Sequence, residues 1–421
     1  MHELPRALQD FTPANGQIKL DYDDFQVEEI PLYPAAGSGT HTYFLVQKAG
    51  LTTPQAANDI ARALGVRRRD LGFAGMKDSR AVTRQWFSLE HVDPNAIQQI
   101  QLPRISILDV TQHRNKLRLG HLKGNRFLIR VRNTHTTRLT DLQSALASLT
   151  THGVPNYFGP QRFGSRGDTW QTGQALLRND LDTALDLILG QPGEFDHGAI
   201  RRARDLYHQG HYTQARSLWP GMFRDERRAL ATLQRTSGNK RRALAAIDKG
   251  TRRLYVSAYQ SHLFNQVVAA RLATGLQSLW PGDLAYLHAN GAVFTVEDAP
   301  AEQPRADAFE ISPTGPLFGY RMTEPAGQAA EIEARLLTEA NLTRATFHQG
   351  PHRVKGSRRP VRFRPENAEI RLGADQRGAY LELSFVLPRG CYATCLLREL
   401  FTEQGPQSLA ADDPGTEDHT D

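Results

Sequence analysis

The chain has 421 residues, of which 39% are hydrophobic and 23% charged, a composition typical of a folded protein long enough for two domains. No run approaches eighteen apolar residues and the N-terminus lacks a signal-peptide pattern, so we expect neither a membrane span nor export. Cys391 and Cys395, the two cysteines, exclude a disulfide framework and a cysteine-based zinc site, and we expect a protein of the reducing cytoplasm.

The positive charge is concentrated in a few segments. The formal net charge is +6, and basic residues cluster at 113–132, 201–253 and 353–371. The last twenty residues, 402–421, carry acids but no Lys or Arg. Separated basic clusters are typical of a protein that binds a polyanion such as nucleic acid. The alternative is a set of solvated surface charges.

The N-terminal part of the chain predicts an arm, two strands and a helix. Residues 1–16 are expected to be a loosely held arm, and the alternation in 17–30 predicts a strand. Phe25, which stands beside acids in that strand, is either a core residue or part of a binding site. Residues 41–48 predict a second strand. Thr53 as N-cap, followed by a proline, predicts a helix that Gly65 ends.

The most informative segment is Gly72 to Phe87, which predicts strand, exposed loop and strand. The loop places Lys77 beside Asp78. A carboxylate next to a cation is held ionised at neutral pH, so Asp78 is a candidate nucleophile or base. The alternative is a hairpin turn whose Lys-Asp pair is merely solvated.

Strands are also predicted at 105–110, 116–120 and 127–132, with a turn at Gly124-Asn125 between the last two. A helix is predicted at 139–149. Because side chains alternate along a strand, the segment around 127–132 predicts a basic face opposite an apolar one. The basic face comprises Arg126, Arg130 and Arg132, and the apolar face Phe127, Ile129 and Val131.

The segment 153–164 holds Asn156 and Phe158 between a proline and glycines. An amide offers a donor and an acceptor to the edge of a base, and a phenyl ring offers a stacking face. The alternative is a rigid aromatic turn. Further along, 257–272 predicts an amphipathic helix with Leu263 and Phe264 in its apolar stripe.

The C-terminal part begins with a basic, turn-like segment at 351–364. The alternation in 379–387 predicts a half-buried strand. A turn containing Tyr392 then leads into a helix through Leu400. The acidic tail after Gln404 is expected to be disordered.

Four of these segments together resemble the tRNA pseudouridine synthase D family. The matching patterns are D-F-x-V-x-E at Asp24, G-x-K-D-x-x-A-x-T-x-Q at Gly75, G-V-P-N-Y-F-G-x-Q-R-F-G at Gly153 and L-P-x-G-x-[FY]-A-T-x-x-x-R-E at Leu387. The resemblance implies an α/β (α+β) fold. In that fold a pseudouridine synthase domain with a mixed, largely antiparallel sheet is interrupted by an inserted α/β domain. The expected boundaries are 1–174 and 351–402 for the catalytic domain, 175–350 for the insert, and 403–421 for the tail.

The resemblance also implies a reaction, the isomerisation of uridine-13 in the D-arm of tRNA to pseudouridine after extrusion of the base. It makes Asp78 the nucleophile, attacking C6 of the base or C1′ of the sugar. Lys77 is expected to keep Asp78 ionised and to touch phosphate. The implied substrate-pocket residues are Phe25, Asn156, Phe158 and Tyr392, with Lys19 and Glu29 near the site.

The resemblance implies no cofactor and no metal, and tRNA as the partner. We expect a monomer without an obligatory protein partner. Tyr392 stands where relatives often have Phe, and Cys391 where Ser is common. Two rival hypotheses are a non-catalytic RNA-binding protein and a glycoside hydrolase or lyase. The second would need another carboxylate beside Asp78, for which Glu29 is the candidate.

Overall fold

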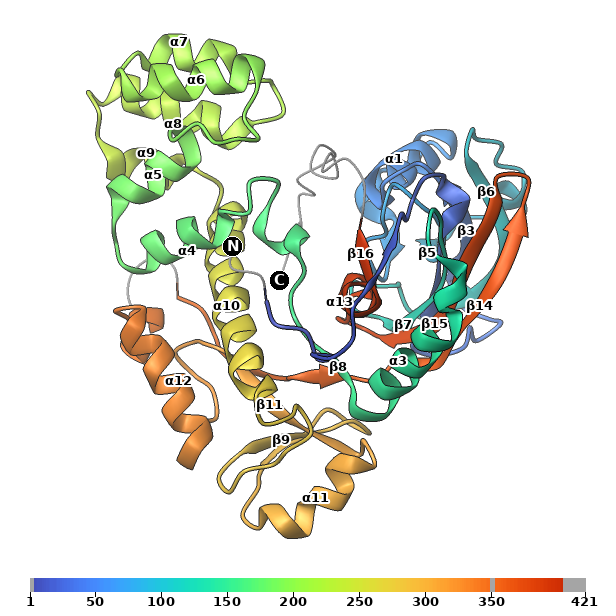
Figure 1. Ribbon diagram of the computed structural model, residues 1–421. Coiled ribbons are helices and arrows are strands. Elements are labelled where there is room, and N and C mark those ends of the chain that lie inside the picture. The colour runs from blue at the N-terminus through green and yellow to red at the C-terminus, as the bar shows by residue number, and fades with distance from the viewer. Residues whose placement is uncertain (1–3, 349–352, 404–421) are drawn as a thin grey trace. The chain divides into compact units, whose positions relative to one another are not determined.

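The structure is a computed structural model that describes residues 4–348 and 353–403 (Figure 1). It divides into two compact units. We call the part formed by residues 6–154 and 363–403 the sheet unit, and the part formed by 155–348 and 353–362 the helix-rich unit. Each has its own hydrophobic core and is described separately.

The sheet unit is built on an eight-stranded mixed sheet. Only the β2–β5 pair is parallel, and the other neighbours are antiparallel. The sheet therefore confirms the predicted mixed, largely antiparallel fold class. In spatial order the strands are β14 (Glu366–Asp375), β15 (Gly378–Pro388), β7 (Leu122–Val131), β2 (Phe25–Pro31), β5 (Val82–Glu90), β3 (His41–Ala49) and β6 (Ile105–His113), and β4 (Gly72–Phe73) pairs with β5.

Helices complete the core of the sheet unit. Helix α1 (Thr53–Ala63) buries Ala57 and Ile60 against Phe44 and Phe87 of the sheet. Its N-cap is Thr52, one residue earlier than predicted, because the Thr52 hydroxyl accepts the backbone N–H of Gln55 at 3.2 Å. The sheet unit also contains α2 (Pro94–Gln98), α3 (Leu139–His152), α13 (Ala393–Leu400) and the parallel pair β1 (Ala14–Gly16) and β16 (Phe401–Glu403).

The helix-rich unit combines a helical region with a four-stranded sheet of order β10-β9-β11-β12. One hydrophobic core of this unit contains Trp219, Leu230, Tyr259 and Phe347. The helices are α4 (Thr169–Leu177), α5 (Leu181–Leu189), α6 (Gly198–His208), α7 (Tyr212–Leu218), α8 (Arg224–Arg235), α9 (Lys240–Ala246), α10 (Lys249–Leu272), α11 (Ala299–Asp307) and α12 (Gly327–Glu339). The strands are β9 (Leu284–Leu287), β10 (Val293–Thr295), β11 (Ile311–Leu317) and β12 (Ser357–Pro360).

Three predictions of local structure were wrong. The strand expected at 116–120 is absent, because that segment forms a loop and turn and β7 begins only at Leu122. The strand expected from residue 17 begins only at Phe25, because Lys19 has a positive φ of 60° and Asp21 caps a 3-10 turn at Tyr22–Asp24. The turn expected at Gly124-Asn125 lies inside β7. There the backbone of β15 approaches so closely that a Cβ on Gly124 would collide with the Leu387 carbonyl.

The domain boundaries at 174 and 351 stay predictions. The division of the structure into units falls elsewhere, after Val154 and after Arg362. The acidic tail lies outside the described residues beyond Glu403. Within the described ranges, no helix is long and apolar enough to cross a membrane.

Candidate active site

The loop between β4 and β5 is fixed by the polar residues of its own sequence pattern. The Gln85 amide donates to the Gly75 carbonyl at 3.1 Å. The Thr53 hydroxyl donates to Gln85 at 2.8 Å and accepts the Lys77 backbone N–H at 2.9 Å. All three side chains are buried. The loop thus has a defined shape, and Asp78 projects from it partly exposed.

The Asp78 carboxylate is paired with an ammonium from a distant part of the chain. Lys19 Nζ donates to Oδ2, and the backbone N–H of Arg80 donates to Oδ1 at 2.9 Å. Burial raises the pKa of Asp78, but Lys19, the Arg80 N–H and Lys48 together outweigh it and hold the pKa below its usual value. The carboxylate is therefore ionised at neutral pH and available as a nucleophile.

Lys77 does not pair with Asp78. Its Nζ lies 2.6 Å from Oε2 of Glu29, and both side chains are buried. The other Glu29 oxygen accepts the backbone N–H of Trp86 at 3.3 Å. Burial raises the pKa of Glu29, opposed by Lys77 and the Trp86 N–H. The expectation that Lys77 keeps Asp78 ionised is thus corrected, because the ammonium is committed to Glu29 inside the unit.

Lys48 is a site residue that the sequence reasoning missed. Its buried ammonium donates to the Leu51 carbonyl and, at 3.3 Å, to the Asp78 carbonyl. Burial lowers the pKa of Lys48 to about 8, against the opposing effect of Asp78. Alternation along β3 was the available signal, since Phe44, Val46 and Lys48 share the buried face.

Phe25 lies next to the ion pair, with Lys19 Nζ 4.4 Å from its ring centroid. The ring is only 4% exposed and packs edge-on against Phe127, with centroids 6.2 Å apart. The structure therefore brings Phe25, Lys19 and Asp78 together. Tyr392 belongs to the same unit, where it is the partly exposed N-cap residue of α13.

Asn156 belongs to the helix-rich unit and is almost fully buried there. Its amide donates to the Pro360 carbonyl at 2.9 Å, and its oxygen accepts from the Arg359 guanidinium. Donor and acceptor are therefore both engaged within the unit. The predicted contact with a nucleotide would require these partners to be exchanged.

Phe158 is likewise packed inside the helix-rich unit. Its backbone N–H and carbonyl are both bonded by the Asn265 side chain, at 2.8 and 3.0 Å. Its ring meets Phe264 edge-on at 5.6 Å, and the Arg359 guanidinium lies 4.3 Å from the ring centroid. The rigid aromatic turn considered as an alternative is thus present at this position.

No three His, Cys, Asp or Glu side chains among the described residues lie close enough together to hold a metal ion. The groups that the structure places at Asp78 are a carboxylate, ammonium groups and an aromatic ring. Such a set is suited to nucleophilic attack on a bound molecule.

Comparison with known proteins gives the family. A model of the family tRNA pseudouridine synthase D (TruD) matches residues 6–400. The tRNA pseudouridine synthase D of Geobacter metallireducens is 46% identical over 388 residues, covering 92% of this chain and 95% of the relative. That of Geobacter sulfurreducens is 44% identical over 405 residues, covering 96% and 98%. The chain belongs to the tRNA pseudouridine synthase D family.

The crystal structure of a Methanosarcina mazei protein assigned to tRNA pseudouridine synthase D is also similar. It superposes with a TM-score of 0.81 at 26% identity and covers 94% of this chain and 95% of its own. The mixed α/β fold of this member of the family is thereby confirmed. The resemblance drawn from the sequence motifs is confirmed as well.

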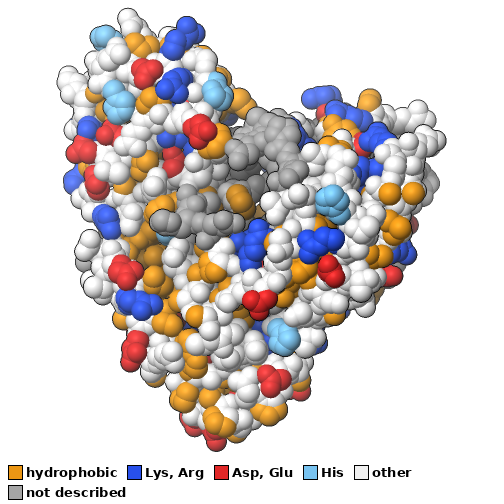
Figure 2. All heavy atoms as spheres, viewed as in Figure 1, with side chains coloured by type: hydrophobic (Ala, Val, Ile, Leu, Met, Phe, Trp, Pro, Cys, Tyr) orange, Lys and Arg blue, Asp and Glu red, His pale blue; other side chains and the backbone are white. Residues whose placement is uncertain are grey.

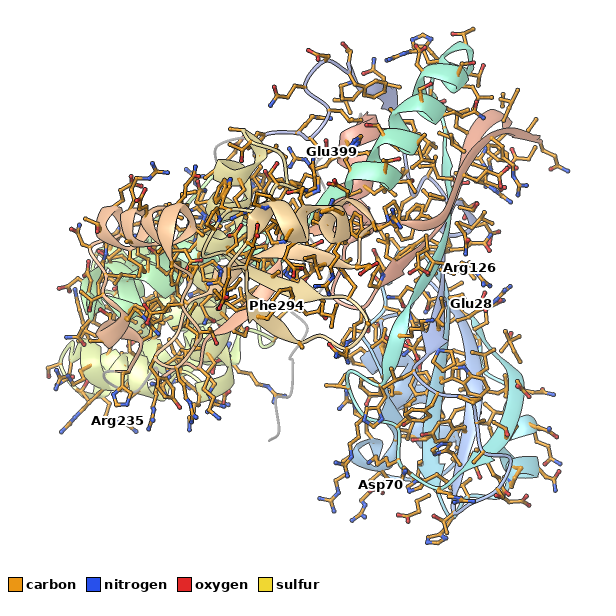
Figure 3. All side chains as sticks on the ribbon, turned by 90° about the horizontal axis from the view of Figure 1, so that it is seen from below. Glu28, Asp70, Arg126, Arg235, Phe294 and Glu399 are labelled. Carbon is orange, nitrogen blue, oxygen red and sulfur yellow. The ribbon has the colours of Figure 1, made fainter. Side chains whose placement is uncertain are left out.

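In this member of the tRNA pseudouridine synthase D family, the predicted basic face of β7 is neutralised by acids. Figure 3 shows Arg126 beside Glu28 on the neighbouring strand β2. These arginines therefore stabilise the sheet and are not free cations. The pairs are Arg126 with Glu28 (3.7 Å), Arg130 with Glu382 (3.6 Å), and Arg132 with Asp24 (2.7 Å) and Asp375 (2.7 Å).

The basic segment 201–253 is also less uniform than its sequence indicates. Arg204 is buried and bonds to Asp196 at 3.1 Å and to three backbone carbonyls. On the face shown in Figure 2, acidic and basic side chains are mixed over α6, α7 and α8. The cationic side chains that are exposed include Arg202, Arg216, Arg224, Arg235, Arg241, Arg242 and Arg253.

Proposed function

We propose that the protein isomerises uridine-13 in the D-arm of tRNA to pseudouridine, with Asp78 as the nucleophile. The observation that carries this proposal is the Asp78 carboxylate, ionised by Lys19 and held by the Arg80 N–H on a loop with the family's spacing. Relatives that carry the name tRNA pseudouridine synthase D support the same substrate class. An enzyme acting on tRNA is expected to work in the cytoplasm, as a monomer.

The proposed reaction breaks the bond between N1 of uracil and C1′ of ribose, and then joins C5 of the same ring to C1′. Asp78 forms the covalent bond that holds one fragment while the uracil turns. Once C5 is joined to C1′, the bond to Asp78 breaks and restores the carboxylate. C5 then loses its proton to water, and N1 takes up a proton in its place. Isomerisation leaves the substrate's composition unchanged, so the step consumes no co-reactant.

Lys19 takes the role that the sequence assigned to Lys77. Its ammonium favours the ionised form of Asp78 and lies over Phe25 at the same time. The buried Lys77–Glu29 pair instead anchors the loop to strand β2 in the interior of the sheet unit. Phe25, Asn156, Phe158 and Tyr392 are proposed to contact the extruded nucleotide.

A glycoside hydrolase mechanism fits less well. It would need a second carboxylate free to act across the scissile bond. Glu29, the acid considered for that role, is buried and paired with Lys77. The loop therefore offers one exposed carboxylate, which favours the isomerase over the hydrolase.

The test is Asp78→Asn, which is nearly isosteric but cannot attack as a carboxylate does. We expect single-turnover tritium release from tRNA labelled at C5 of uridine to fall by several orders of magnitude. Binding to tRNA should stay within about tenfold of the parent. The matched control is Asp70→Asn, since Asp70 pairs with Arg67 on the approach to the loop and is half exposed. Turnover near the parental rate in Asp78→Asn would overturn the mechanism.

The position of the modified uridine needs a separate experiment. We expect mass-spectrometric mapping of tRNA from cells with and without this protein to differ at position 13. Pseudouridine missing at another position instead would keep the chemistry and refute the assigned target.

A further inference from the structure

A cavity lies within the sheet unit, where β3 and β6 form one edge of the sheet. It has a volume of about 790 Å³, within the range of small-ligand sites. Its walls come from the loop after β2, the start of β3 and the segment that follows β6. The lining includes Tyr33, His41, His113, Arg114, Lys116 and Arg118.

The charges of this cavity favour an anion. Arg114 and Arg118 are exposed and make no ion pair with any of the described residues. Lys116 donates to the backbone carbonyl of Arg69 at 2.9 Å and adds a third positive charge to the lining, although it also acts on the nearby Asp70 carboxylate. Glu90 is the one acid in the lining. Three cations against one carboxylate are suited to a phosphate group.

The cavity also has a flat aromatic wall. Tyr33 stacks on His113 with centroids 5.0 Å apart, and Tyr43 stacks on the same imidazole at 4.8 Å. The Tyr33 hydroxyl is bonded to Nδ1 of His121 at 2.8 Å. The rings are therefore held in place before any ligand binds, as a stacking surface for a base requires.

One buried polar atom in the lining lacks a partner. His41 is 7% exposed, and its Nδ1 makes no hydrogen bond with any residue that the structure describes. Its Nε2 lies 3.7 Å from Glu90. Buried polar atoms are normally bonded, so an unsatisfied nitrogen in the wall of a cavity indicates a position that a ligand atom fills.

This cavity is separate from the Asp78 site. His41 begins β3, whereas Lys48, which bonds the Asp78 carbonyl, stands seven positions further along the same strand. At the rise of a strand the two sites are roughly 23 Å apart. One molecule the size of a nucleotide cannot occupy both.

We propose that the cavity binds a second nucleotide of the RNA substrate, away from the reacting uridine. The phosphate lies among Arg114, Lys116 and Arg118, and the base rests on the Tyr33–His113 wall within reach of His41 Nδ1. This inference rests on the proposed function, which supplies the tRNA. An RNA chain can occupy the cavity and the Asp78 site at the same time, because one RNA strand is long enough to reach both.

The test compares tRNA binding by the parent and by Arg114→Ala/Arg118→Ala, using filter binding at several salt concentrations. We expect the variant to bind about tenfold or more weakly. The slope of log affinity against log salt should flatten by about 0.7 to 0.9 for each phosphate group that the variant no longer neutralises. The matched control is Arg62→Ala/Arg371→Ala, which removes the same charge from other exposed positions of the sheet unit.

A second variant tests the aromatic wall. Tyr33→Leu should weaken tRNA binding about fivefold or more while leaving the salt slope at the parental value, because stacking carries no charge. Melting temperatures of all variants check that they fold. Equal affinity and slope in Arg114→Ala/Arg118→Ala and its control would overturn the assignment.

Two further measurements distinguish a free nucleotide from RNA as the ligand, and failure of the proposed function from failure of the cavity inference. Cytidine 5′-monophosphate is titrated into the parent and into both cavity variants. Tight binding of this free nucleotide at the cavity, with tRNA affinity unaffected by the variants, would refute the RNA assignment. If the parent binds no tRNA, the proposed function is refuted. If the parent and the cavity variants bind tRNA with equal affinity, only the inference about the cavity is refuted.

Discussion

The ion pair between Lys19 and Asp78 controls when the candidate nucleophile is charged. Burial raises the pKa of Asp78, and Lys19 is the strongest of the groups that lower it. In Lys19→Met, burial is opposed by fewer positive groups, so the pKa of Asp78 rises. We expect the acid limb of the single-turnover rate to move to higher pH in Lys19→Met than in the parent. Tritium release measured from about pH 3 to about pH 8, which spans the usual pKa range of a carboxyl group, checks this.

Lys19→Arg is the control for that experiment, because it keeps the positive charge beside the carboxylate. Its acid limb should stay close to the parental one even where altered geometry lowers the rate. An unshifted limb in Lys19→Met would show that Lys19 does not set the charge of Asp78. Lys48 would then be the next group to test.

The lowered pKa of Lys48 leads us to expect that the stability of the protein rises with pH. Its pKa is about 8 in the folded protein and near 10.4 in an unfolded chain. Between these values the unfolded chain holds a proton that the folded protein has released, so the free energy of unfolding rises with pH. Relative to Lys48→Met, the parent should gain on the order of 3 kcal/mol across this window. Urea unfolding at pH 7.5 and pH 10 measures the difference.

Lys48→Met removes the titrating group but keeps a side chain of similar length in the buried position. A parent-to-variant difference that is constant from pH 7.5 to pH 10 would mean that the ammonium stays charged when folded. The loop would then be held by a charged lysine throughout the working range.

The sequence placed Asp78, Phe25 and Lys19 in one site, and the structure brings these three together. It assigned Lys77 the wrong partner. Neighbouring residues suggest a pair, but the partner of Lys77 is 48 residues away on β2, and only the sheet brings it close. Pairings made by tertiary structure leave no trace in spacing, which is also why Lys48 was missed.

Strands and helices were predictable where local residue patterns determine them. The run 41–48 predicted β3, β-favouring residues predicted β5, alternation predicted β15, and the apolar stripe predicted the second half of α10. The failure at Gly124 has a different cause. A glycine ordinarily indicates a turn, but here it allows two strands to approach, and that requirement is visible only in the partner strand.

Helix α6 gives a prediction about basic residues that look equivalent in sequence. Arg204 is buried, paired with Asp196 and bonded to three carbonyls, whereas Arg202 is exposed on the same helix. Arg204→Ala leaves a buried carboxylate and carbonyls without partners, and should cost about 3 to 5 kcal/mol of stability. Arg202→Ala should change it by about 0.5 kcal/mol or less. Thermal denaturation of both variants makes the comparison.

The same two variants separate stability from RNA binding. If Arg204 served the substrate, Arg204→Ala would lose tRNA affinity while melting like the parent, contrary to our expectation. Arg202→Ala is expected to retain its melting temperature whatever its effect on RNA.

At the scale of the whole molecule, the chain carries two units with separate cores. Units that each have a hydrophobic core of their own can unfold separately, so we expect denaturation in two transitions rather than one. Lys48→Met should move only the transition of the sheet unit, and Arg204→Ala only that of the helix-rich unit. Differential scanning calorimetry resolves the two. A single transition moved by both variants would show that the units unfold together.

The sequence located this division only approximately. The residue composition changes near residue 175, where the helical patterns of the helix-rich unit begin to dominate. The unit itself begins earlier, with the short motif around Asn156. Residue composition indicates where helices begin. It does not indicate which core the turn at 153–164 packs against, because the packing of this turn depends on bonds to Asn265 and Arg359, which are far away in sequence.

The buried pair of Glu29 and Lys77 restricts how this protein can change over evolutionary time. Loss of either partner leaves an isolated charge in the interior, which costs far more than most substitutions. The two positions are therefore free to vary only jointly, by a double replacement with neutral side chains or an exchange of the two charges. Among descendants of this chain, positions 29 and 77 should covary, although neither side chain is proposed to touch the substrate.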